Sequence, residues 1–76
     1  MGNGRFTHAG VEYLIECWVE PDGSVSKLSV VYPPVMGPSY APDFLYEGWP
    51  DKGAAISAAR RRAEGVIDRW LAKAAR

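Results

Sequence analysis

The most constraining feature of the sequence is the alternation in residues 11–20, VEYLIECWVE. Valine, isoleucine, tyrosine and cysteine occupy every second position, and three glutamates lie among the residues between them. This period of two is typical of a half-buried β-strand. The turn sequence PDGS follows, and then a second apolar run, residues 25–33. A four-residue loop brings the apolar faces together and places Leu28, Val30 and Tyr32 opposite Cys17, Ile15 and Tyr13. The pattern predicts a β-hairpin over 11–33.

The rest of the chain predicts one more strand and one helix. Residues 33–43 contain four prolines and a glycine, which indicates a stiff loop. The short aromatic run 44–47 predicts a third strand at a sheet edge. Asp51 is a suitable N-cap for a helix over 52–74. Apolar residues recur at helical spacing along one face of that segment: Ile56, Ala59, Ala63, Val66, Ile67, Trp70 and Leu71.

These elements predict an α+β fold, in which a three-stranded antiparallel sheet packs on one long C-terminal helix. Residues 1–10 are glycine-rich and polar, and we expect them to form a flexible N-terminal tail. Residues 11–76 are then a single β-β-β-α domain, because a chain of 76 residues is long enough for only one small core.

Composition narrows the classes of protein further. An apolar content of 47% excludes a wholly disordered chain. One cysteine and one histidine leave no intrachain disulfide and no zinc cluster, so we expect neither a metal nor a cofactor. No apolar run reaches the length of a membrane span, and the N-terminus carries neither a secretory signal nor a myristoylation motif, since Phe6 replaces the expected serine or threonine. We therefore expect a cytoplasmic protein with no membrane partner.

The run Arg60–Arg62 resembles a nucleic-acid motif, but helical geometry spreads its side chains over about 200° of the helix surface. The coherent basic feature is a stripe at spacing i, i+7 and i+11, formed by Arg62, Arg69 and Lys73. This stripe has three interpretations: a solvated helix face, a docking site for an acidic surface such as the glutamate-rich sheet of a second copy, or a phosphate site. Nucleic acid is disfavoured as a partner because the net charge is zero.

A second candidate surface lies on the side of the hairpin that faces away from the helix. Leu14, Trp18 and Val31 are apolar there, although glutamates surround them. An exposed apolar patch on a small domain is typical of an interface, so these residues predict self-association as a homodimer. The alternative is that the proline-rich loop folds back over Trp18. Aromatic residues between the prolines could likewise bind a partner or pack on the chain's own sheet.

The sequence contains no set of residues that is typical of a catalytic site. An enzyme needs convergent reactive groups, and the single histidine, His8, falls in the predicted tail. Cys17 alternates with core residues, which predicts a buried apolar role rather than a reactive thiol. We expect a protein that is not an enzyme.

The order of hairpin, third strand and helix resembles two families. Tyr13, Ile15, Asp22, Gly23, Ala59, Ala63, Ile67 and Asp68 match a pattern in small uncharacterised bacterial proteins, some of them encoded by prophages, which have a curved antiparallel sheet on a helix. The alanine-rich helix ending in Trp70 and Leu71 is also similar to the partial fold of HicB-type antitoxins, which neutralise a small ribonuclease. The segment YAPDFLYEGWPDKGAA departs from that second family at the third strand and the helix entry, and we expect no appended DNA-binding domain.

These observations predict a small accessory or interaction protein that self-associates through its sheet. The second resemblance implies, as an alternative, an antitoxin-type module that binds a ribonuclease toxin. A third possibility is a weak nucleic-acid binder that uses the basic stripe of the helix.

Overall fold

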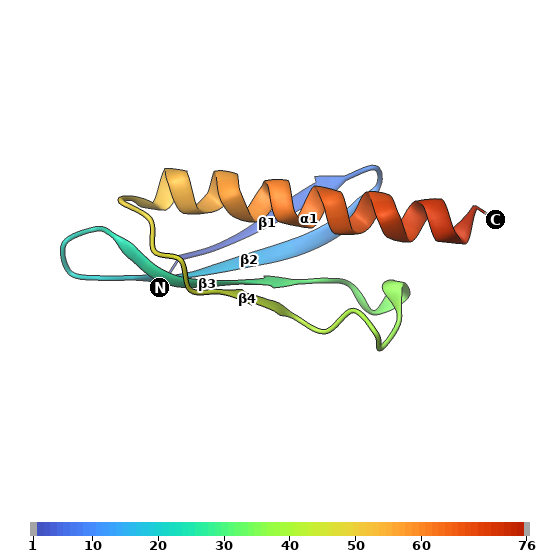
Figure 1. Cartoon of the computed structure of the whole chain (residues 1–76), viewed down its shortest axis with the longest axis horizontal. Coiled ribbons are helices and arrows are strands. Elements are labelled where there is room, and N and C mark those ends of the chain that lie inside the picture. The colour runs from blue at the N-terminus through green and yellow to red at the C-terminus, as the bar shows by residue number, and fades with distance from the viewer. Residues whose placement is uncertain (1, 76) are drawn as a thin grey trace.

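The computed structural model describes residues 2–75, with the side chains of residues 4–75. A four-stranded antiparallel sheet in the order β1-β2-β3-β4 carries one long helix along one of its faces (Figure 1). The elements are β1 (Gly2–His8), β2 (Val11–Val19), β3 (Val25–Val31), the short 3-10 helix η1 (Pro34–Met36), β4 (Asp43–Leu45) and α1 (Lys52–Ala74). The α+β class is therefore confirmed, but the sheet has four strands rather than three.

The predicted hairpin has the predicted register. Cys17 pairs with Leu28 and Ile15 with Val30, so the apolar faces of β2 and β3 coincide. At the turn, Gly23 has a φ of 90°, and the Asp22 carboxylate accepts a hydrogen bond of 2.9 Å from the backbone of Ser24. Beside the turn this register is interrupted, because a shift between Trp18 and Val19 places Val25 opposite Val19.

The prediction of a flexible tail is also wrong, because residues 2–8 form β1 along the edge of β2. Alternation within this strand turns Phe6 and His8 toward the helix, where the Phe6 ring stacks on Tyr13 with 5.9 Å between ring centroids. His8 Nε2 lies 2.8 Å from Asp68 Oδ1 and joins the strand to α1. The link to β2 contains Ala9 and Gly10, both with positive φ, as in the tight turns of two-residue hairpins.

The third predicted strand and the helix are both present. The strand covers Asp43–Leu45 rather than 44–47, lies at the edge of the sheet as expected, and is followed by a bridge between Trp49 and Val25. The helix has the predicted bounds, and the Asp51 carboxylate caps it by accepting a hydrogen bond of 2.8 Å from Ala54 N.

The core lies between the sheet and one face of α1. Tyr13, Ile15, Cys17, Leu28 and Val30 from the sheet meet Ala55, Ala59, Ala63 and Ile67 from the helix, and all nine are almost completely buried. Ile56, Trp70 and Leu71 are only partly buried. Figure 1 shows that the C-terminal end of α1 extends past the end of the sheet. No helix within residues 2–75 is long and apolar enough to cross a membrane.

Candidate functional site

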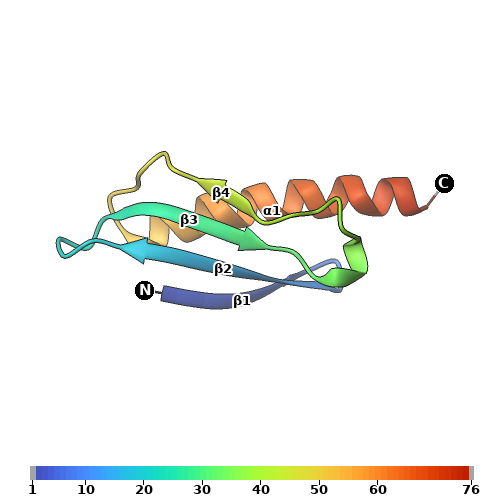
Figure 2. The same ribbon diagram turned by 90° about the horizontal axis from the view of Figure 1, so that it is seen from below.

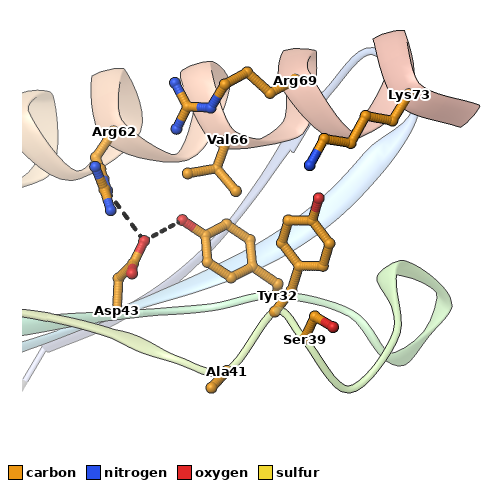
Figure 3. A pocket seen from close by; sticks show the side chains of 9 residues that line it. Tyr32, Ser39, Ala41, Asp43, Arg62, Val66, Arg69 and Lys73 are labelled. Carbon is orange, nitrogen blue, oxygen red and sulfur yellow. Dashed lines mark hydrogen bonds and ion pairs between the residues drawn. The ribbon is translucent and has the colours of Figure 1, made fainter.

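A cleft of about 280 Å³ lies between α1 and the segment that joins β3 to β4 (Figure 3). We call it the basic cleft. The helix contributes Arg62, Val66, Arg69 and Lys73, and the opposite wall consists of Tyr32, Ser39, Tyr40, Ala41 and Asp43. The structure thus places all three residues of the predicted basic stripe in one concave site.

Local structure explains why these side chains converge. The spacing of seven and eleven residues keeps Arg62, Arg69 and Lys73 on one flank of α1. Tyr32 follows directly after β3, and Asp43 begins β4, so both are held by the sheet. Between them, Met36 of η1 is buried in the core and anchors the proline-rich loop beside the helix. The tyrosine rings of residues 32 and 40 pack edge to face with centroids 6.4 Å apart.

Asp43 forms an ion pair with Arg62, one of the three cations of the basic stripe. Its Oδ2 accepts a hydrogen bond of 2.6 Å from the Tyr32 hydroxyl and one of 3.1 Å from Arg62 Nε. The hydrogen bond and the charge of Asp43 raise the pKa of the Arg62 guanidinium. Arg69 and Lys73 form no ion pair with a carboxylate in the described part of the chain. The cleft therefore holds one compensated cation and two uncompensated ones.

The Tyr32–Asp43 pair predicts a loss of stability at alkaline pH. Burial raises the pKa of Tyr32, and the hydrogen bond and charge of Asp43 raise it further. Above about pH 10, where an unfolded tyrosine ionises, the unfolded state therefore loses its proton first. This contribution to stability is complete below that pH and is lost as pH rises through the folded-state pKa.

We expect the free energy of unfolding to fall less steeply from about pH 9.5 to pH 11.5 in Tyr32→Phe than in the natural protein. Urea denaturation at a series of pH values measures this difference. Parallel curves for the two proteins would show that Tyr32 does not carry the effect.

The second candidate surface is the face of the sheet turned away from α1, which we call the outer sheet face. Figure 2 views the molecule from this side, with α1 behind the strands. Strand register and contacts assign to this face the residues Arg5, Glu12, Leu14, Glu16, Trp18, Lys27, Val31, Phe44 and Tyr46. The three predicted interface residues, Leu14, Trp18 and Val31, all belong to it and are partly exposed.

Lys27 contacts the three aromatic side chains of this face. Its Nζ lies 4.2 Å from the centroid of the Trp18 ring, 5.4 Å from that of Phe44 and 5.8 Å from that of Tyr46. The sequence pattern does not predict that Phe44 and Tyr46 belong to this face. Their side chains reach this face only because β4 pairs with β3 and places Phe44 opposite Ser29.

The alternative in which the proline-rich loop covers Trp18 is wrong. The loop leaves β3 at the end of the sheet opposite the β2–β3 turn, whereas Trp18 lies beside that turn (Figure 2). The shallow pocket at Trp18 is lined by Val19, Glu20, Ser26 and Lys27 and by no loop residue. No element within residues 2–75 therefore covers the aromatic part of the face.

Comparison of this chain with known proteins found no similar sequence or structure. No protein-family model matches the chain, and neither the curated proteins nor the solved structures contain a significant match. The two surfaces that the fold creates, the basic cleft and the outer sheet face, are therefore the candidate functional sites.

Proposed function

We propose that this chain is a non-enzymatic interaction module that forms a homodimer by packing its outer sheet face against the same face of a second copy. The observation that carries the proposal is the cluster of Trp18, Phe44 and Tyr46 around Lys27, on a sheet face that no element within residues 2–75 covers. Sheets stack face to face at about 10 Å, with side chains of the two faces interdigitating.

Exposed aromatic area supplies a driving force for association. Phe44 is 49% exposed and Tyr46 is 68% exposed, and both belong to the class of residue enriched at interface cores. Leu14 and Val31 extend the apolar surface toward the other end of the strands. Burial of this surface in a dimer removes it from water, which favours association by roughly 25 cal/mol for each Å² of apolar area.

The charged residues of the outer sheet face favour a second copy of this chain as its binding partner. The face carries two cations, Arg5 and Lys27, and two carboxylates, Glu12 and Glu16, with Glu20 beside Trp18 at its end. Its charges are therefore mixed in sign and can pair with those of a second copy. The whole chain also has a formal net charge of zero, so no long-range repulsion opposes the approach of two copies. A partner with a large net charge of one sign would not be complementary to a face that carries charges of both signs.

The size of the face is adequate for a small dimer interface. Strands of seven, nine, seven and three residues, at a rise of about 3.3 Å and a spacing of about 4.8 Å, give roughly 400 Å² of flat area. Protruding side chains enlarge the accessible area, which brings it to the roughly 600 Å² per partner of the smaller specific interfaces. The dimer would then have two sheet layers inside and one helix on each outer side.

Replacement of Trp18 by glutamate tests this arrangement. The natural protein should sediment with twice the chain mass at micromolar concentration, and Trp18→Glu should sediment as a monomer with unchanged far-UV circular dichroism. The reason is that the substitution removes the largest apolar side chain of the face and buries a carboxylate between the two sheets, where its pairing with the neighbouring Lys27 does not repay the desolvation of both charges. Analytical ultracentrifugation over a concentration series measures the change.

Val35→Glu is the matched control, because Val35 is 72% exposed but belongs to η1, at the end of the sheet opposite the β2–β3 turn beside which Trp18 lies (Figure 2). It introduces the same side chain and should leave the dimer intact. A natural protein that stays monomeric, or a Trp18→Glu variant that remains dimeric, would overturn the proposal. The second result would point instead to pairing through the free edge of β1.

A further inference from the structure

We propose that the basic cleft is a binding site for a phosphate monoester, a dianionic group attached to a small organic substituent. The site lies between α1 and the loop that follows β3, and none of its lining residues belongs to the outer sheet face. The inference therefore does not depend on dimer formation.

The balance of charges in the cleft selects a dianion. Asp43 compensates Arg62 through a hydrogen bond of 3.1 Å, so the positive charges of Arg69 and Lys73 remain. A phosphate monoester carries a charge between about −1.5 and −2 at neutral pH and can compensate both cations. A carboxylate or a phosphodiester carries one negative charge and would leave one cation uncompensated.

The arrangement of donors also suits phosphate. Arginine presents a planar fork of N–H groups, and lysine presents a compact ammonium group, the two side chains that most often bind phosphate oxygens. In Figure 3 the Lys73 side chain points from α1 toward the loop, whereas the Arg69 side chain runs along α1 with its guanidinium beside Gly65. Arg69 is exposed and forms no ion pair with a carboxylate within residues 2–75, so its side chain can turn toward an anion bound in the cleft. Ser39, on the opposite wall, adds a hydroxyl group that can donate a further hydrogen bond.

The remaining lining provides space and contact for the substituent. Val66 and Ala41 are apolar, and the rings of Tyr32 and Tyr40 form an edge-to-face pair beside them. The volume of about 280 Å³ lies at the lower end of the range for small-molecule sites. A phosphate with one small planar substituent fits this space, whereas a flat acidic protein surface could not reach into it.

Titration calorimetry with phenyl phosphate tests the inference, and methyl phenyl phosphate serves as the singly charged comparison. We expect saturable binding of the monoester that is about tenfold or more tighter than binding of the diester, because the second charge contacts a second cation. Arg69→Gln and Lys73→Gln should each weaken binding of phenyl phosphate by about tenfold or more.

Arg61→Gln is the matched control, since Arg61 is an exposed arginine on the same helix but outside the basic cleft. It removes the same charge from the chain and should change the affinity by less than about twofold, because solvent screens distant exposed charges. Absence of saturable binding, or equal affinity for monoester and diester, would overturn the inference.

Two further outcomes would also overturn it. An equal loss in Arg61→Gln would show a general effect of net charge rather than a site. Tighter binding of an oligonucleotide that lacks a terminal phosphate would show that the basic stripe recognises a diester backbone. Because Trp18→Glu leaves the cleft intact, its affinity for phenyl phosphate should equal that of the natural protein, which keeps this test separate from that of dimer formation.

Discussion

Replacement of Ile67 by alanine is expected to lower the free energy of unfolding by about 2–5 kcal/mol. Ile67 is completely buried at the interface between α1 and the sheet, so truncation removes apolar contacts and leaves a cavity that the rigid sheet cannot fill. A domain of this length has a total stability of only about 4–11 kcal/mol. The variant should therefore unfold at much lower urea concentration, as measured by circular dichroism.

Ile56→Ala is the control for this experiment, because the same side chain is truncated on the same helix at a partly buried position. Its loss of stability should be less than about half that of Ile67→Ala, since less apolar area leaves water when the chain folds. Both variants need to be compared at one protein concentration, because dimer formation would add to the apparent stability. Equal losses would show that the face of α1 turned toward the sheet is misassigned.

Enlargement of Ala59 to leucine is expected to destabilise the protein by about 1–3 kcal/mol, although leucine is more apolar. Ala55, Ala59 and Ala63 form a completely buried stripe along α1, opposite the large side chains of the sheet. Small residues in this stripe let the helix backbone approach β2 and β3 closely. A leucine would separate the two layers or force strained rotamers. Thermal or urea denaturation measures the loss.

Ala72→Leu is the matched control, since Ala72 is exposed near the end of the same helix. Alanine and leucine have similar helix propensities, so this change should alter the stability by no more than about 0.5 kcal/mol. If Ala59→Leu were as stable as the natural protein, the helix and the sheet would be more loosely packed than the complete burial of Ala59 indicates.

Part of the candidate site could be predicted from sequence because it depends on local geometry. Helical spacing alone places Arg62, Arg69 and Lys73 on one flank of α1. The compensation of Arg62 by Asp43 could not be predicted in this way. It requires β4 to lie at the sheet edge beneath α1, which brings together two residues 19 positions apart in the chain. The same dependence on β4 explains why Phe44 and Tyr46 were missed on the outer sheet face.

The sequence by itself determined the elements whose signals are periodic or local: the β2–β3 hairpin and its register, the capped helix, and the burial of Cys17. Only the tertiary structure decided that residues 2–8 form a strand. Their polar, glycine-rich composition has a weak propensity, and the strand is held by its ladder with β2 and by the contacts of Phe6 with Tyr13 and of His8 with Asp68. Such contacts join positions far apart in the chain, so they exist only once the layers have packed, whereas a periodic pattern acts within a single element.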